Sequence, residues 1–305
     1  MINIPEGFYE LVIKCKEYYG DSHLIDRKKI NNEDIHNNAV FVVFLRLGGM
    51  LDEAQSNYLI EVVEKDDKLL DKEYILHTPF LKWSERLLKL IESEKKIEHN
   101  STKLATLSII RPSTNPEAPI KRLYDDLFNF LEYIKNKPFD KDLVNNSIPS
   151  KDKDAEIIGD IKKQVRGIAF TKATLFCYGI GIGFDFSAVS QHVKSFIKLF
   201  VKSYVDLNED YYPINNKLEQ IFLKKYQSKD SKILMRHIDL AIYALYVGRA
   251  QLFEKHGKSK VTPRMILDWI DFKKMNLDKF LEIIGNIDEI ENYAQDFTDF
   301  MVARM

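Results

Sequence analysis

The stretch EIIGDIKKQVRGIAFTKATLFCYGIGIGFDFSAVSQHVKSFIKLF, residues 156–200, decides the fold because it is the least polar part of a charge-rich chain. Apolar residues near its start recur at helical spacing, and they are Ile157, Ile158, Ile161 and Val165. Gly167 ends that helix, since glycine takes the left-handed conformation that a helix stop needs. A second helix carries Lys172 and ends at Gly179, Gly181 and Gly183. The stretch therefore predicts two helices joined by a short turn.

Lys172 is the unusual residue of this stretch, because a lysine seldom occurs inside an apolar segment. A lysine that is withdrawn from water has a lowered pKa, and its neutral amine is a nucleophile. Alternatively, the side chain extends its ammonium group along its own stem to water and has no chemical role. Residue type alone favours this second interpretation, so the rest of the chain must decide between them.

Amphipathic helices are expected on both sides of this stretch. The clearest one follows it, with apolar residues at Val193, Phe196, Ile197, Phe200, Val201 and Tyr204. Further helices are expected over residues 7–20, 51–63, 79–92, 119–136, 216–226, 235–253 and from 262 onward, ending in an acidic tail over 277–305. One short strand is expected near residues 104–110 or 39–45, where periodicity does not separate a buried strand from a buried helix.

Residues 137–154 contain two prolines and many charges, which is typical of a boundary between lobes. The sequence thus predicts an N-terminal helical lobe over residues 1–148 and a second lobe over residues 149–305, both parts of one functional unit. The predicted fold class is all-α, a two-lobed helical bundle.

Composition excludes several classes of protein. Of the 305 residues, 45% are hydrophobic and 30% charged, as in globular proteins. The formal net charge of −1 means that any binding of anions must come from local clusters. Two distant cysteines predict no disulfide framework, which fits a reducing compartment. The N-terminus does not read as a signal peptide, and the longest uncharged apolar run, residues 173–184, is too short to span a bilayer. We expect a cytoplasmic protein without a membrane partner.

Two clusters of basic residues could contact phosphate groups. The turn between the two helices carries Lys162, Lys163 and Arg166. Backbone N–H groups at such a turn can also face a phosphate. A basic stripe on the following helix is formed by Lys194, Lys198 and Lys202. Each cluster has a simpler alternative, because solvated lysines are common on an ordinary helical hairpin and on the wet face of an amphipathic helix.

Three further patterns in the sequence bear on its chemistry. The run GIGIG at residues 179–183 lacks the G-x-G-x-x-G spacing and the flanking strand of a dinucleotide site. A metal site built from His192, His237 and nearby aspartates has no supporting ligand spacing, so we expect neither a metal nor a cofactor. Asp239 and Tyr243 lie one helical turn apart, where a carboxylate and an aromatic ring can recognise a base by hydrogen bonding and stacking. The alternative is a pair at the edge of the core.

Four segments carry a family resemblance, namely QVRGIAFTKATLF (164–176), AVSQHVKSF (188–196), RHIDLAIYALYVGRA (236–250) and HTPFLKWSERLLKL (77–90). The first resembles the helix–hairpin–helix element of DNA glycosylases, in which a lysine opens the second helix. The second resembles the segment that follows that element, and the last two resemble segments of the archaeal 8-oxoguanine DNA glycosylase group. The resemblance covers about half of the chain and implies a helix–hairpin–helix fold.

The resemblance also implies roles for individual residues. Lys172 matches the lysine that attacks the sugar C1′ and forms a Schiff base in glycosylases with lyase activity. The hairpin matches the element that grips a phosphate, and its residues are Val165, Arg166 and Gly167. Asp239 matches an acidic residue of the base pocket. Tyr243 stands where the group has a tryptophan that stacks on the flipped base.

One departure from the family pattern concerns the catalytic acid. The family has an aspartate before the helix that here begins near His192, and Ser190 occupies that position. A serine is a good helix N-cap, but it carries no charge to stabilise an oxocarbenium-like state. Asp185 is the nearest carboxylate in the sequence, and we expect it to compensate for the missing charge. The change from tryptophan to Tyr243 also leaves open whether the base is an oxidised purine or a bulky modified base of foreign DNA.

The sequence therefore predicts a monomeric DNA glycosylase, with or without lyase activity, whose partner is double-stranded DNA containing a damaged or modified base. Lys172, Asp185 and Ser190 are the expected catalytic residues, and the expected DNA-binding residues are Arg166, Gly167, Lys194 and Lys198. The alternatives are a catalytically impaired protein of the same fold that binds DNA or a protein partner, and a helical interaction protein with no role in nucleic-acid binding.

Overall fold

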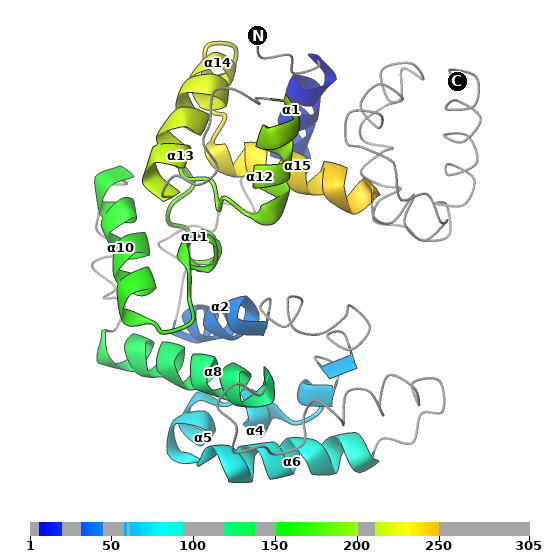
Figure 1. The fold of residues 1–305 in the computed structure, drawn as a ribbon, viewed down its shortest axis with the longest axis vertical. Helices are drawn as coiled ribbons and strands as arrows, with labels where there is room; N and C mark the ends of the chain where they lie inside the picture. The colour runs from blue at the N-terminus through cyan, green and yellow to red at the C-terminus, as the bar shows by residue number, and fades with distance from the viewer. Residues whose placement is uncertain are drawn as a thin grey trace, which may run out of the picture. The chain divides into compact units, whose positions relative to one another are not determined.

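The computed structural model describes residues 6–19, 32–44, 58–59, 62–93, 119–137, 151–200 and 211–249 (Figure 1). Within these ranges the regular structure is helical and contains no strand, so the predicted all-α class is confirmed for them. By its internal contacts the chain divides into two units: unit 1 comprises residues 1–24 and 184–305, and unit 2 comprises residues 25–183. The predicted lobe boundary after residue 148 lies outside the described residues.

Unit 2 contains seven labelled helices in its described part. They are α2 (Asn32–Phe44), α4 (Asp67–Leu70), α5 (Lys72–His77), α6 (Phe80–Ser93), α8 (Pro119–Asn136), α10 (Lys151–Gln164) and α11 (Phe170–Gly179). Two of them, α4 and α5, are short. Helix α8 begins at Pro119, as the sequence predicts, and α6 begins at Phe80, one residue after the predicted first residue Pro79. In Figure 1, α8 lies between α2 and the group formed by α4, α5 and α6, and it packs against α2, α5 and α6.

The core of unit 2 is organised around two aromatic side chains. Trp83 on α6 is fully buried, and its indole N–H donates to the Leu69 carbonyl at 3.1 Å. Phe130 on α8 is also fully buried, and its ring centroid lies 4.7 Å from that of Phe176 on α11. These contacts tie the helix that carries Lys172 to the core of its own unit.

The strand alternative at residues 39–45 is wrong for residues 39–44, because helix α2 continues through Phe44. Ala39, Val42 and Val43 are buried where α2 packs on α8 and α11. A run that is apolar on most sides fits a helix enclosed by two others as well as it fits a buried strand, which is why periodicity does not separate the two. The other strand alternative, residues 104–110, lies outside the described residues.

Asp66 and Arg86 form an ion pair that links the start of α4 to α6. The Arg86 guanidinium donates from Nε to one carboxylate oxygen and from Nη2 to the other at 2.9 Å. Asp66 also caps α4 by accepting from the Lys68 N–H at 3.2 Å. The hydrogen bond from Arg86, followed by that from the Lys68 backbone, outweighs burial and holds the pKa of Asp66 below its usual value.

This ion pair predicts a pH-dependent difference in stability. A carboxyl group whose pKa is lowered by folding stabilises the fold above its unfolded-state pKa of about 4, and this stabilisation is lost as the pH falls through the lower folded-state pKa. Arg86→Gln should therefore lower the unfolding temperature by about 1–3 °C at pH 7. Thermal melts from pH 7 to pH 2.5 should show this difference shrink below about pH 4. Lys89→Gln, on the exposed face of α6, is the control and should show a flat difference.

Unit 1 combines a helix near the N-terminus with helices from the second half of the chain. The described helices are α1 (Glu6–Tyr19), α12 (Gln191–Phe200), α13 (Tyr211–Leu218), the π-helical segment η5 (Glu219–Leu223), α14 (Lys224–Gln227) and α15 (Met235–Arg249). Helix α15 packs against α1 and α12, and Figure 1 shows it passing next to both. An aromatic core joins α1 to α12 and η5, since the Phe8 ring lies 4.6 Å from Phe196 and 6.3 Å from Phe222.

The helix expected over residues 216–226 is confirmed in place but differs in geometry. Residues 211–227 form continuous helical turns, and the turn Glu219–Leu223 is π-helical. A π turn adds one residue to the repeat. Leu218 and Leu223 are five residues apart and both buried, so the wider turn lets both reach the core. Nothing in the spacing of apolar residues separates this arrangement from a regular α-helix.

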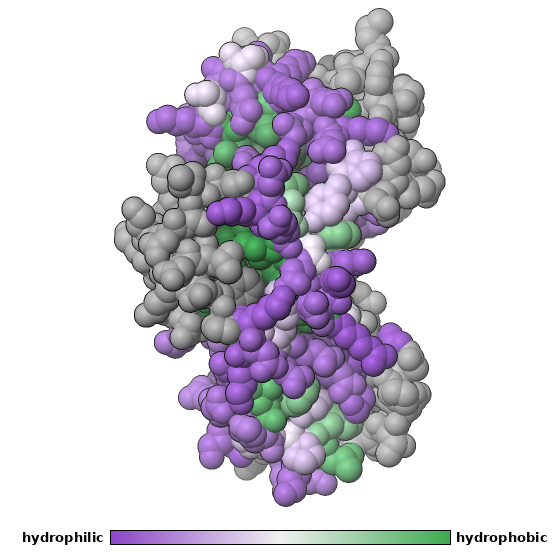
Figure 2. Space-filling model, turned by 90° about the vertical axis from the view of Figure 1, so that its left-hand side faces the viewer, coloured by the Kyte–Doolittle hydropathy of each residue, from purple (hydrophilic) through white to green (hydrophobic). Residues whose placement is uncertain are grey.

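The described surface is mainly hydrophilic on the face that Figure 2 shows, with small hydrophobic patches between hydrophilic residues. Both cysteines, Cys15 and Cys177, are buried and neither forms a disulfide, and burial raises the pKa of the Cys15 thiol to about 12. A buried thiol with so high a pKa is inert. None of the described helices is long and apolar enough to cross a membrane.

Candidate functional site

The turn between α10 and α11 forms as the sequence predicts. Helix α10 ends at Gln164, and Gly167 has the left-handed backbone conformation, with φ +83°. Val165 and Ile168 are buried and anchor the turn, and the Ile168 N–H donates to the Val165 carbonyl at 3.2 Å. The basic residues of the turn, Lys162, Lys163 and Arg166, are exposed. This part of unit 2 therefore presents positive charge to solvent on a fixed backbone.

Lys172 is the third residue of α11, two residues after the helix begins at Phe170. The residue as a whole is half-buried, and its amine nitrogen is buried. The next two residues along the helix, Ala173 and Thr174, are fully buried. The amine is thus withdrawn from bulk water. This agrees with the interpretation of Lys172 as a nucleophile and disagrees with the interpretation in which its ammonium group extends to water.

The glycine run ends α11 and closes a tight packing arrangement. Helix α11 ends at Gly179, where a Cβ atom would lie 1.6 Å from the amide nitrogen of Asn38 on α2. Gly181 and Gly183 both have φ +75°. The Gly183 N–H donates at 2.8 Å to the buried carboxylate of Asp154 on α10. The glycines therefore serve the packing of α11 against α2 and α10.

Gly183→Ala should destabilise unit 2 by about 1–2 kcal/mol, because an alanine at φ +75° is strained. The added methyl group would also meet the Ile158 side chain at 3.1 Å. Gly159→Ala, in the interior of α10, is the matched control, and it should stabilise the helix by up to about 1 kcal/mol. Urea denaturation of the two variants would show opposite signs, whereas a shift of both in one direction would contradict the assignment.

The remaining predicted site residues belong to unit 1. Ser190 is half-buried and caps α12, since its hydroxyl accepts from the Val193 N–H at 3.3 Å. Asp185 is half-buried in a turn that precedes Ser190 in the chain. Of the basic stripe, Lys194 is half-buried and Lys198 is exposed, and Lys202 lies outside the described residues.

Asp239 and Tyr243 lie on α15 in very different environments. Asp239 is buried, and its two carboxylate oxygens accept from the Ser187 hydroxyl and the Ala188 N–H, each at 2.8 Å. Tyr243 is 54% exposed, which sets it apart from most large apolar residues of the described part. Its ring lies 6.2 Å from that of His192 on α12, and the His192 ring lies 4.9 Å from Tyr246.

The predicted residues thus fall into two groups, each held within one unit. Unit 2 carries Arg166, Gly167 and Lys172 on α10, its turn and α11. Unit 1 brings the segment around Ser190 together with Asp239, and Tyr243 together with His192. Sequence reasoning missed Ser187, which lies in this segment, and Asn215 on α13, which binds it. Neither residue gave a signal, because nothing in the sequence says which groups a serine in a loop or an asparagine in a helix would meet.

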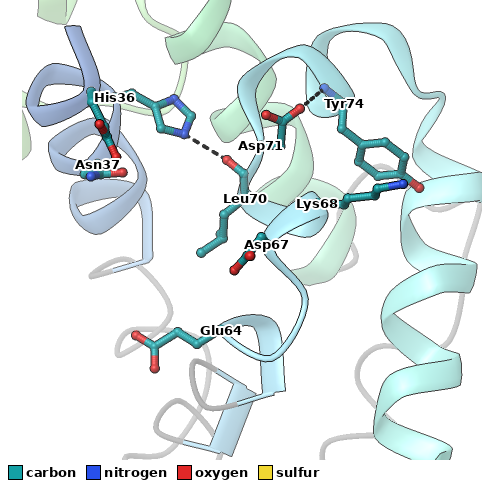
Figure 3. Close-up of a pocket in the computed structure, with 9 residues that line it drawn as sticks. His36, Asn37, Glu64, Asp67, Lys68, Leu70, Asp71 and Tyr74 are labelled. Atoms are coloured by element: carbon teal, nitrogen blue, oxygen red, sulfur yellow. Dashed lines mark hydrogen bonds between the residues drawn. The ribbon is translucent and has the colours of Figure 1, made fainter.

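Unit 2 also contains a pocket of about 730 Å³ that no sequence pattern indicated. It is lined by Glu33, His36, Asn37, Glu64, Asp67, Lys68, Leu70, Asp71 and Tyr74. Figure 3 shows a hydrogen bond from His36 Nε2 to the Leu70 carbonyl, at 2.8 Å, joining α2 to the end of α4. Burial is the main cause that lowers the pKa of His36, so the ring is neutral at pH 7. In the described part of the chain, no group of three or more His, Cys, Asp or Glu residues is arranged to hold a metal ion.

The assignment of the site rests on these residues and their geometry. Comparison with protein-family models, with curated proteins and with solved structures finds no match to this chain.

Proposed function

We propose that the protein is a DNA glycosylase of the helix–hairpin–helix type, which excises a damaged or modified base from double-stranded DNA. The observation that supports this most is the position of Lys172. Its amine nitrogen is buried at the start of α11, a few residues after an exposed basic turn with a left-handed glycine. A lysine withdrawn from water is suited to act as a nucleophile on a sugar carbon.

Substrate binding in this proposal is mainly electrostatic. The exposed turn with Arg166 and Gly167 contacts a phosphate, and Lys194 and Lys198 contact the backbone elsewhere on the duplex. The target base leaves the stack and rests on an aromatic face. The exposed ring of Tyr243 supports this assignment, because more than half of its surface is available to a ligand. A base-pocket role for Asp239 stays a prediction from the family resemblance.

The proposed chemistry begins with attack of the Lys172 amine on the sugar C1′. The N–C1′ bond forms as the glycosidic bond breaks, and the base leaves with the bonding electron pair and takes up a proton. Opening of the sugar ring and loss of a proton from the amine nitrogen give a Schiff base, from which strand cleavage by elimination follows. Asp185 supplies negative charge to the electron-poor sugar. Ser190 contributes only a neutral hydroxyl.

A second function is favoured by one specific observation. Ser190 carries no charge, and its hydroxyl already accepts the Val193 N–H as a helix cap. A protein of the same fold without a catalytic acid would bind DNA, or a protein partner, without excising a base. The two proposals predict different effects of Ser190→Asp. If the protein is a non-catalytic relative, the new carboxylate should create base excision that the wild type lacks. If the protein is a glycosylase, the substitution should change the rate of an excision that the wild type already performs.

The test is a panel of duplexes that each carry one modified base, among them an oxidised purine and a bulky modified pyrimidine. Each duplex is incubated with the full chain, with and without borohydride, and assayed for base release, strand cleavage and a trapped adduct. The glycosylase proposal expects release from at least one duplex. If no duplex releases a base but duplex binding weakens steeply with salt, the DNA-binding alternative is supported. Absence of DNA binding at low salt would contradict the glycosylase proposal and the DNA-binding alternative, and it would leave the protein-partner form of the second function.

A further inference from the structure

The segment Phe186–Ser190, which leads into α12, has a strained backbone. Val189 has φ +45°, and no other non-glycine residue of the described part has a positive φ. A β-branched residue in this region costs on the order of 1–3 kcal/mol, so it persists only where its surroundings over-determine it. Neighbouring groups must therefore hold the backbone of Val189 in this conformation.

Two buried side chains from other helices hold the segment through Ser187. Asn215 on α13 accepts from the Ser187 N–H at 2.6 Å, and its amide donates to the Ser187 carbonyl at 3.3 Å. Its amide also donates to the Tyr211 carbonyl at 3.1 Å. Asp239 on α15 binds the Ser187 hydroxyl and the Ala188 N–H. Both backbone groups of Ser187 and its side chain are thus fixed from outside the segment.

The Ser187 hydroxyl connects these contacts to the backbone of Val189. It donates to Asp239, and it accepts from the Val189 N–H at 3.1 Å. Ser187 is fully buried, Asn215 is 3% exposed and Asp239 is 7% exposed. Hydrogen bonds in so dry a network are strong, and an unsatisfied member would be costly. The network is therefore built to hold one conformation of the backbone.

We propose that Asn215 and Asp239 are positioning residues, which hold Val189 in the left-handed conformation and thereby set Ser190 at the start of α12. The chain turns sharply at Val189, and one residue later the Ser190 hydroxyl caps the helix at the Val193 N–H. The part of this inference that concerns catalysis rests on the proposed function, because Ser190 occupies the position assigned to assist Lys172. The part that concerns the backbone of the segment depends only on contacts within unit 1.

The first experiment is a double-mutant cycle between Asn215→Ala and Val189→Gly. Glycine adopts φ +45° without strain, so the strain that Asn215→Ala can release in the wild type is absent from the Val189→Gly background. We expect Asn215→Ala to lower the folding equilibrium constant by about fivefold or more beyond its effect in the wild type when Val189 is replaced by glycine, because relaxation of Val189 offsets part of the loss in the wild type. An equal loss in both backgrounds would show that Asn215 does not hold Val189 in its strained conformation and would overturn the proposal. Asn216→Ala, at the exposed neighbouring position, is the control and should change little.

Ser187→Ala is a milder variant in case Asn215→Ala does not fold. It keeps the two backbone bonds to Asn215 and removes only the link from Asp239 to Val189. Hydrogen exchange should then accelerate at Val189 and Val193 by tenfold or more while the α1 amides are unchanged. Unchanged exchange at both positions would contradict the proposal. Neither this measurement nor the cycle requires DNA.

The catalytic arm uses whichever duplex the wild type cleaves. Asn215→Ala and Ser187→Ala should each slow base release at saturating DNA by about tenfold or more, with duplex affinity changed by less than about twofold. Val189→Gly should restore part of the lost rate in the Asn215→Ala background, which a purely structural defect would not allow. If the wild type releases no base, the glycosylase proposal fails, while the stability cycle still tests Asn215 and the hydrogen exchange of Ser187→Ala still tests the link from Asp239.

Discussion

Lys172→Ala is expected to abolish the adduct that borohydride traps on a cleavable duplex. The trapped species is a reduced bond between the lysine nitrogen and the sugar C1′, so a chain without that amine has nothing to reduce at this position. Base release should slow on the order of a thousandfold, since removing a nucleophile removes the intermediate that divides one difficult step into two easier ones. Denaturing gels after borohydride treatment measure the adduct, and single-turnover release measures the rate.

Lys163→Ala is the matched control for this experiment, since Lys163 is an exposed lysine on the neighbouring helix α10. It should weaken duplex binding and lower the slope of log affinity against log salt by about one, while an adduct still forms at saturating protein. Lys172→Ala should instead leave that slope almost unchanged. An adduct of undiminished yield with Lys172→Ala would assign the nucleophile to another amine.

Trp83→Ala should destabilise unit 2 by about 3–5 kcal/mol. The indole is fully buried, its ring lies 5.5 Å from that of Tyr124 on α8, and its N–H satisfies the Leu69 carbonyl. The substitution leaves a large cavity between α6 and α8, and it also leaves a buried carbonyl without its donor. Thermal melting followed by far-ultraviolet circular dichroism should show the helical signal of unit 2 lost at a clearly lower temperature.

Two further variants separate the causes of this loss. Leu81→Ala removes an apolar side chain that is 53% exposed on the same helix, and it should change stability by less than about 0.5 kcal/mol. Trp83→Phe keeps most of the ring contact but removes the N–H, and it should cost about 1–3 kcal/mol. A loss of the same size for Leu81→Ala and Trp83→Ala would contradict the location of the core.

Much of the fold could be predicted from local patterns in the sequence. Pro119 opens α8, Thr78-Pro79 precede α6, and Gly167 ends the turn after α10, because each of these residues restricts or frees its own backbone. The cap that Ser190 forms is local in the same way. The helix through Val42 and Val43 was not distinguished from a strand, since its apolar character comes from neighbours that are distant in sequence.

The candidate site was predictable only in part, for the same physical reason. The burial of the Lys172 amine and the exposure of Tyr243 follow from packing, but the two residues were chosen from motif spacing. Asn215 had no such spacing, because the groups of the site that it binds lie 28 residues earlier, on Ser187. The left-handed conformation of Val189 is unfavourable for a β-branched residue, so only the tertiary hydrogen bonds could have indicated it.

The division of the chain has a consequence for how the protein is made. Unit 1 is assembled from residues 1–24 and residues 184–305, with the whole of unit 2 between them. Helix α1 begins at Glu6, and α15, against which it packs, begins at Met235. At roughly 5–20 residues per second, a ribosome needs on the order of ten to fifty seconds to synthesise the intervening segment. During that time the apolar face of α1, with Phe8 and Leu11, cannot pack against α15. Unit 2 is synthesised before α15 and can fold first.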